Sequence, residues 1–388
     1  MNHTTYLKSL LMAFALGISA MPLYAQQDPT MSIEDCIDFA IKNRNSIKNA
    51  RFDEAIGKAK NNEVKGLAFP KLSVDGKYQE FIDIPQSFIP GAFFGQPGGF
   101  VAVEFTPKYG SNLSSSISQI LFDGSVAVAL EARKTLMGLY EINTKRSIEQ
   151  VRMDVSKAYY NVQIAQERLV LLAQTTENIK KLKNDVEAMY KSGLVEKLDV
   201  DRMAVTYNNI ETEKIKLSNF VELSIQLLKF QMGMPMQQKL AVQKVDEANI
   251  KQLATSIDKA NFQYENRLDY NLVSTQLNLN KLDAKRYKWA AMPTIVAFGN
   301  AGYNYATSEF KNLFGSKYIF SSLWGIQANV PLFDGFQRRN KLKQAEFAIE
   351  KTKNDLATLS QAIDLEQEQA STNLKNNFLA LESQKTNV

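Results

Sequence analysis

The chain contains almost no cysteine or histidine, which removes several classes of chemistry. Its 388 residues include a single cysteine, Cys36, and a single histidine, His3. One thiol allows no disulfide within the chain, and Cys36 is expected to lie buried in a helix. His3 belongs to a segment that export would remove, so the mature chain offers no imidazole for general-base catalysis, for a catalytic triad or for a metal ion. We therefore predict no enzymatic activity, no metal and no cofactor.

Acidic residues are absent before Asp28, and this absence accompanies a signal for export. Lys8 is followed by an apolar run, residues 10–18, and then by Leu23, Tyr24 and Ala25. This order is typical of a secretory signal peptide, which we assign to residues 1–25. A lipid anchor at the new N-terminus is not expected, because no cysteine follows the cleavage site directly.

The charge balance is mild, and long apolar runs are missing. Removing Lys8 lowers the formal net charge from +5 to +4 (46 − 1 − 41), which is too small to indicate nucleic acid or an anionic membrane surface as a partner. Beyond the signal peptide there is no apolar run of about 18 or more residues, the length that a membrane-spanning helix requires. If this protein crosses a membrane, it does so with β-strands.

Two parts of the chain resemble each other at a nearly constant spacing. The first landmarks are 223 residues apart and the last are 211 apart, so the first copy holds 12 extra residues. The stretch 84–99, with three prolines and four glycines, accommodates them. Such self-similarity indicates one structural unit repeated in tandem. The landmarks are Asn43 and Arg44 with Asn266 and Arg267, Pro70 with Pro293, Gly76 with Gly299, and Phe122, Asp123 and Gly124 with Phe333, Asp334 and Gly335.

Each copy is predicted to form a helix, a strand, a loop, a second strand and a long helix. Ser32 and Asp35 form the pattern of a capping box at the first helix. Pro70 and Pro293 then end the helical pattern and begin an extended one. We assign repeat 1 to residues 26–245, with a β-hairpin at 70–122 and a long helical hairpin at 124–232. Repeat 2 is residues 246–388, with a β-hairpin at 293–333 and a long helix from 335.

Four segments alternate between polar and apolar residues, the pattern of strands with one polar face. Each has roughly ten residues, which suits a strand that crosses a membrane at a tilt. The apolar face would meet lipid, with aromatic girdle residues Tyr78, Tyr303, Tyr305 and Trp324. A soluble β-sandwich with one exposed face is the alternative. The polar face would line a wet lumen and comprises Ser73, Asp75, Lys77, Gln79, Ser114, Ser116, Gln327 and Asn329.

A very long helix is predicted to follow each hairpin. The first runs from Gly124 to about Tyr190, roughly 65 residues or about 100 Å. A second helix returns from about Leu198 to Met232, where Gly233 ends it. Apolar residues recur at alternating steps of three and four, which is the heptad pattern of a left-handed coiled coil. The seam comprises Ile148, Val151, Val155, Ala158, Val162, Ala165, Leu169, Leu172, Thr176 and Ile179, and in copy two Leu342, Ala345, Ile349, Thr352, Leu356, Leu359 and Ile363.

A sheet of four strands cannot lie alone in a membrane, because its two edges would leave backbone groups unpaired in hydrocarbon. The strands must therefore pair with strands of other chains, and the even strand numbers of bacterial barrels permit a dimer, a trimer or a larger ring. The predicted fold class is mixed α and β. A transmembrane β-barrel closed by oligomerisation would continue as a long periplasmic α-helical coiled-coil barrel.

These features together resemble the TolC-like outer-membrane efflux proteins, the outer-membrane factors of tripartite systems. The resemblance rests on the tandem copies, on the proline before each first strand, on the Phe-Asp-Gly motifs and on the turn between the long helices, and it covers the chain from Met31. It implies a homotrimer with a 12-stranded barrel in outer-membrane lipid and a helical part in the periplasm. Such ducts receive small molecules or proteins from an inner-membrane transporter through a periplasmic adaptor.

The resemblance also implies roles for the turn of the long helical hairpin. Tyr190, Gly193, Leu194 and Val195 would form the periplasmic tip that contacts the adaptor, and Asp199 would be a pore gate. A ring of identical acids would concentrate cations at a constriction. Structural interpretations stay open, because Gly193 can simply end a helix and Asp199 can favour the positive end of the next one.

Other acids have structural interpretations. Asp123 and Asp334 each lie between a strand and a helix, where a carboxylate caps free backbone N–H groups. Asp201 could form a salt bridge with Arg202 at the tip, although a solvated pair is the commoner outcome. These residues are therefore not counted as functional.

The second copy departs from the family pattern, because the sequence ends at Val388, about 60 residues before a counterpart of Met232. We expect a C-terminally truncated chain, in which the seam around Ile363 lacks a neighbouring helix. The runner-up function is a periplasmic adaptor or another coiled-coil scaffold, which would share the signal peptide and the heptads. Adaptors usually place one helical hairpin between halves of small β domains, whereas here strands and long helices occur twice.

Overall fold

The structure, a computed structural model, divides into two compact units. It describes residues 30–95, 98–244, 262–312, 315 and 317–386. The first unit comprises residues up to Asn49 and residues 147–257, and the second comprises residues 50–146 and 258–388. The signal peptide at 1–25 and the predicted repeat boundary after residue 245 lie outside the described residues. The tandem repeat itself stays a prediction, because packing groups the chain differently.

The first unit begins with α2 (Ile33–Asn43), which has the predicted capping box. The Ser32 hydroxyl accepts the Asp35 N–H at 3.1 Å, and the Asp35 carboxylate accepts the Ser32 hydroxyl at 2.7 Å and its N–H at 3.1 Å. These hydrogen bonds lower the pKa of the Asp35 carboxyl group. The helix ends at Arg44, whose extended backbone separates it from α3 (Asn45–Gly66). No glycine or proline marks this break in the sequence.

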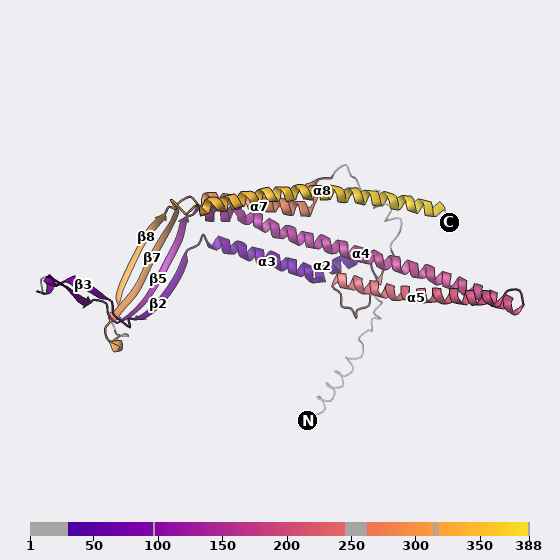
Figure 1. Ribbon diagram of the computed structural model, residues 1–388, viewed down its shortest axis with the longest axis horizontal. Coiled ribbons are helices and arrows are strands. Elements are labelled where there is room, and N and C mark those ends of the chain that lie inside the picture. Colours follow the sequence, from indigo (N-terminus) through magenta and orange to yellow (C-terminus); the bar gives the residue numbers. More distant parts are fainter. Residues whose placement is uncertain (1–29, 96–97, 245–261, 313–314, 316, 387–388) are drawn as a thin grey trace, which may run out of the picture. The chain divides into compact units, whose positions relative to one another are not determined.

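The core of the first unit lies among α2, α4 (Gly124–Lys191) and α5 (Lys197–Met232). Figure 1 shows α5 returning antiparallel along the end of α4. Cys36 of α2 and Leu228 of α5 are fully buried in this core. Complete burial of one such large apolar side chain is worth about 1.5–3 kcal/mol, so this cluster stabilises the unit. The predicted seam supplies the α4 side: Val151, Val155, Ala158 and Val162 all belong to the cluster.

Two short strands, which the sequence pattern does not predict, close this core. β1 (Thr30–Met31) pairs in parallel with β6 (Ala241–Val242). The buried Tyr159 of α4 donates its hydroxyl to the Gln243 carbonyl oxygen at 2.5 Å, and the Met31 carbonyl oxygen lies 3.3 Å away. Tyr159 therefore fixes both strands to α4. Burial raises the pKa of Tyr159 to about 12.

The second unit is built on a four-stranded antiparallel sheet. Its strands are β2 (Lys71–Glu80), β5 (Tyr109–Phe122), β7 (Thr294–Thr307) and β8 (Ile319–Asn329), in the order β2-β5-β7-β8. These are the four segments in which alternation predicts strands. The pairing of β5 with β7 joins the two hairpins into one sheet and leaves β2 and β8 at its edges.

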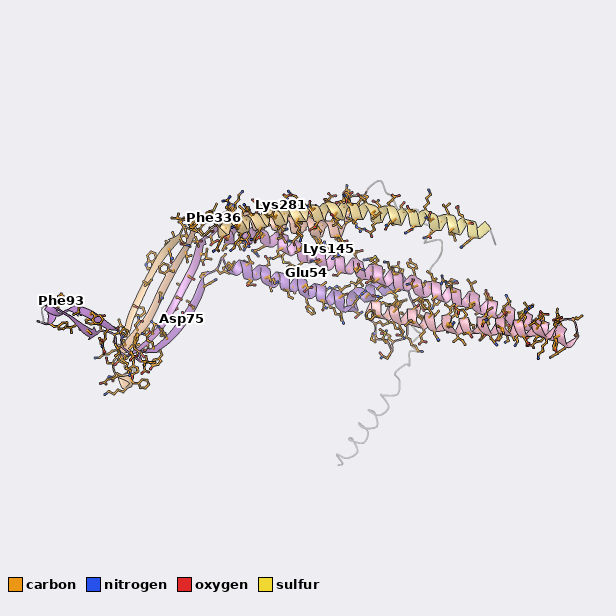
Figure 2. All side chains as sticks on the ribbon, viewed as in Figure 1. Glu54, Asp75, Phe93, Lys145, Lys281 and Phe336 are labelled. Carbon is orange, nitrogen blue, oxygen red and sulfur yellow. The ribbon has the colours of Figure 1, made fainter. Side chains whose placement is uncertain are left out.

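A smaller sheet lies between β2 and β5 in the chain. β3 (Gln86–Pro90) and β4 (Phe100–Glu104) pair antiparallel and are connected through η1 (Gly91–Phe94). The sequence pattern predicts only a loop here, because prolines and glycines interrupt the alternation. Large apolar side chains are exposed on this hairpin, including Phe93 at its end (Figure 2).

The helices of the second unit continue from the sheet. α7 (Leu268–Trp289) lies along the first half of α8 (Gln337–Thr386), as Figure 1 shows. The Asn280 side chain donates to the Thr352 hydroxyl oxygen at 2.8 Å between them. No helix within the described residues is both long and apolar enough to cross a bilayer.

The seam of α8 is better covered than the sequence predicts. Ile363, expected to lack a neighbour, is only 3% exposed. The turn η2 (Tyr264–Asn266) lies beside it: Tyr264 donates its hydroxyl to Asp364 at 2.7 Å, and Arg267 pairs with Glu366 at 2.6 Å. The expectation was therefore wrong, because the segment before α7 covers this part of α8.

Candidate functional site

The four-stranded sheet has one polar face. Ser73 pairs with Ser116 and Asp75 with Ser114, and paired residues of an antiparallel sheet point to the same side. Through β7, the same side continues to Gln327 and Asn329 of β8. All eight residues predicted to line a lumen therefore share one face, including Lys77 and Gln79. Figure 2 labels one of the eight, Asp75.

Polar side chains on this face join neighbouring strands. The hydroxyl oxygens of Ser73 and Ser116 lie 2.7 Å apart. The Asn112 amide donates to the Asn304 side-chain oxygen at 2.5 Å, and Asn304 in turn donates to the Ser321 hydroxyl at 3.2 Å. Cross-strand pairs of this kind each stabilise a sheet by roughly 0.2–1 kcal/mol. Apolar residues interrupt the polar face at Ile120, Val296, Phe298, Ala306, Ile319 and Leu323.

The opposite face of the sheet is apolar and largely uncovered. It carries the four predicted girdle residues, and Trp324 is 84% exposed in the isolated chain. A continuous exposed apolar surface on a folded protein indicates contact with lipid or with another protein. Its other large members are Leu72, Val74, Leu113, Ile117, Phe320 and Ile326.

Each Phe-Asp-Gly motif connects a strand to a helix. The Asp123 carboxylate accepts the Val126 N–H at 3.0 Å, and the Asp334 carboxylate accepts the Arg338 N–H at 3.0 Å. The predicted capping roles are confirmed. The two glycines serve different needs: a Cβ at Gly124 would collide with the Trp289 carbonyl oxygen, whereas Gly335 adopts a left-handed backbone with φ +63°.

The turn between α4 and α5 ends the helical hairpin of the first unit. Gly193 has φ +73°, the Gly193 N–H donates to the Tyr190 carbonyl at 3.0 Å, and the Leu194 N–H donates to the Met189 carbonyl at 2.9 Å. This is a Schellman motif, so Gly193 has the helix-ending role that the sequence left open. Leu194 is 75% exposed beside it, and Val195 is half-buried.

Asp199 lies in the first turn of α5, where a negative charge favours the helix N-terminus. Its carboxylate pairs with Arg202 at 3.7 Å. Among the described residues Asp201 forms no salt bridge with Arg202, which agrees with the commoner outcome expected for it: a separation of three residues brings side chains to one helix face, whereas adjacent residues point apart. Both partners are well exposed, and such a pair contributes about 0–1 kcal/mol.

Neither a metal-binding cluster nor an exposed cysteine is present among the described residues. They contain no group of three or more histidine, cysteine or acidic residues that could hold a metal ion. Burial raises the pKa of the Cys36 thiol to about 12, which opposes formation of the reactive thiolate. The candidate sites are the two faces of the sheet in the second unit and, separately, the hairpin tip of the first unit.

No protein-family model and no curated protein sequence matches this chain. Its fold, however, is similar to solved outer-membrane channel structures. CusC, whose structures concern folding and transmembrane channel formation, has a TM-score of 0.65 at 15% identity, covering 87% of this chain and 76% of its own. The outer membrane protein VceC of Vibrio cholerae has a TM-score of 0.63 at 15% identity. The match covers 85% of this chain and 76% of VceC.

A third similar structure is the CmeC outer membrane channel of Campylobacter jejuni, with a TM-score of 0.65 at 13% identity, covering 85% of this chain and 68% of its own. Identities this low establish the fold alone. The resemblance to TolC-like proteins is thus confirmed at the level of fold: the chain has the fold of these outer-membrane channel subunits.

Proposed function

We propose that this chain is one subunit of a trimeric outer-membrane exit duct, without enzymatic activity of its own. The duct would pass small molecules or proteins that an inner-membrane transporter delivers through a periplasmic adaptor. The observation that carries the proposal is the sheet with one polar face, one exposed apolar face and two edges without partners among the described strands.

Closing the sheet into a barrel with identical chains would give both edge strands a hydrogen-bonding partner. Edge strands β2 and β8 would pair with β8 and β2 of neighbouring copies, which satisfies backbone groups that water cannot reach in a membrane. Three copies of four strands give 12, within the range of bacterial barrels. The apolar face with Trp324 would meet lipid, and the polar face with Asp75 and Lys77 would enclose the duct.

The helices would extend into the periplasm and end at the tip. Leu194 projects beyond the Schellman turn and is the most exposed apolar side chain of that turn, which suits contact with an adaptor. Asp199 is a weaker gate candidate, because its charge already has Arg202 and the helix N-terminus as partners.

Fractionation of cells that express the full chain tests the proposal. We expect recovery in the outer membrane, with a band that migrates as a multimer before heating and as a single chain after heating. Recovery as a soluble periplasmic protein, without a heat-modifiable band, would favour the alternative of an adaptor or coiled-coil scaffold.

A photocrosslinker at Leu194 tests the tip. We expect capture of an adaptor in cells that contain the complete pump. Leu223 of α5 is the control position, because it is similarly exposed but lies away from the turn. Equal capture from both positions, or none from Leu194, would count against the tip assignment while leaving the barrel proposal intact.

A further inference from the structure

Positive charge gathers where the sheet of the second unit meets its helices. The end of α7 and the beginning of α8, residues 281–291 and 334–344, hold eight basic and two acidic residues, a net charge of +6, whereas the whole chain has +5. Around the other end of the sheet, residues 80–108 and 308–318 hold three basic and four acidic residues, a net charge of −1. Charge is thus sorted between the two ends of the sheet. Figure 2 labels Lys281 on α7 and Phe336 just before α8.

A small cavity lies within this basic region. It measures about 230 Å³ and is lined by Arg286 and Tyr287 of α7, by Asp334, and by Arg338 and Lys341 of α8. Pockets for organic ligands are usually about 300–1,000 Å³, so this one is small for an organic cargo molecule. An anionic headgroup with one phosphate fits both its size and its charge.

Two of the cations in this cavity have no carboxylate partner among the residues that the structure describes. Arg286 is paired with Asp283, at 2.7 Å and 2.9 Å from its two nitrogens, and the Asp334 carboxylate caps α8. Within the described part of the chain, no salt bridge engages Arg338 or Lys341. These two side chains are three residues apart on α8 and so lie on the same face.

Apolar and aromatic groups border the basic region. Leu332, Phe333 and Phe336 precede α8 and are strongly exposed, and the rings of Phe333 and Phe336 lie 5.3 Å apart. Trp289 ends α7. Aromatic residues next to Lys and Arg are typical of the membrane–water interface, where the rings lie at headgroup level and the cations reach outward.

We propose that Arg338 and Lys341, with Arg286 and Tyr287 beside them, bind the phosphate of an anionic phospholipid in the leaflet nearest the helices. The inference rests on the proposed function, because it requires the sheet to span a membrane. The phospholipid would hold the sheet at a fixed depth: its phosphate meets the cations while its chains lie beside Phe333 and Phe336.

Native mass spectrometry of the full-length protein, extracted from membranes in detergent, tests the site with phosphatidylglycerol as the probe. The variant is Arg338→Gln with Lys341→Gln. The control is Lys351→Gln with Lys375→Gln, which removes the same charge from exposed positions further along α8. Each cation near an anionic headgroup adds to the binding free energy, so the loss of two cations should weaken binding of phosphatidylglycerol roughly 30-fold. The control should bind as the unaltered protein does.

Two results would overturn the lipid site directly: equal phosphatidylglycerol binding by the variant and the control, or equal binding of phosphatidylcholine and phosphatidylglycerol. A third result, displacement of the lipid by inorganic phosphate, would overturn it by indicating a site for the free anion. Failure of the proposed function has a different signature, since the protein would then be absent from the membrane fraction. A membrane-inserted multimer without lipid preference would contradict the headgroup site alone.

Discussion

At the scale of the residue, two weak acids lie in the core of the first unit. Burial raises the pKa of Cys36 from 9.0 and that of Tyr159 from 10.0, each to about 12. Folding therefore favours the neutral thiol and the neutral phenol. Stability from these groups is complete below pH 9 and is lost as the pH rises toward 12.

We accordingly expect the urea midpoint of unfolding to fall between pH 9 and pH 12, as followed by circular dichroism. In a Cys36→Ala, Tyr159→Phe variant, the midpoint should depend less on pH over this range, although the variant is less stable overall. An unchanged pH dependence in the variant would show that other groups cause the loss.

Gly193 permits a second prediction at this scale. Its φ of +73° is costly for a residue with a Cβ, so Gly193→Ala should destabilise the hairpin by about 1–2 kcal/mol. Gly138 is the matched control, because it lies inside α4 with open space around its Cα. Gly138→Ala should stabilise by about 0.5–1 kcal/mol. Chemical unfolding measures both, and the same sign for both substitutions would contradict the backbone argument.

At the scale of the element, the seam of the helical hairpin depends on which face a residue occupies. Leu228 is fully buried against α2 and α4, whereas its neighbour Leu227 is 46% exposed. Leu228→Ala should lower the free energy of unfolding by about 2–5 kcal/mol, and Leu227→Ala by much less. Urea unfolding of the two variants makes the comparison, which fails if their losses are equal.

Much of the element structure could be predicted because its signals are local. After Pro70, polar and apolar residues alternate in the sequence, and in the structure they lie on opposite faces of the sheet because cross-strand pairing keeps each set on one side. The carboxylates of Asp123 and Asp334 and the backbone of Gly193 mark helix ends for reasons contained within one turn. These features needed no knowledge of distant contacts.

The misses depend on contacts distant in sequence or on weak patterns. Tyr159 holds β1 and β6 together through contacts with distant residues, and strands of two residues are too short to show an alternating pattern in the sequence. The break at Arg44 accompanies its ion pair with Asp154, 110 residues away. The β3–β4 hairpin was missed because prolines interrupt its alternating pattern. The cover over Ile363 was missed because it comes from a segment about a hundred residues upstream. The roles of Leu194 and Asp199 stay predictions, since they concern partners.

At the scale of the whole molecule, a closed barrel requires partners for β2 and β8, the two edge strands that lack a second neighbour among the described strands. β2 leads away from the helices and β8 returns, so β2 of one chain and β8 of the next would pair antiparallel. Adjacent strands hold paired Cα atoms about 4.5–5.5 Å apart, within the reach of a disulfide. The buried Cys36 does not interfere.

The most direct measurement is therefore disulfide formation between chains in isolated membranes. Ser73→Cys on β2 is combined with one cysteine on β8, either on the polar face at Leu323, Gly325, Gln327 or Asn329, or on the apolar face at Trp324, Ile326 or Ala328. We predict linked products of up to three chains, and only from polar-face positions. Products from both faces, or single chains throughout, would contradict a barrel closed by β2 and β8.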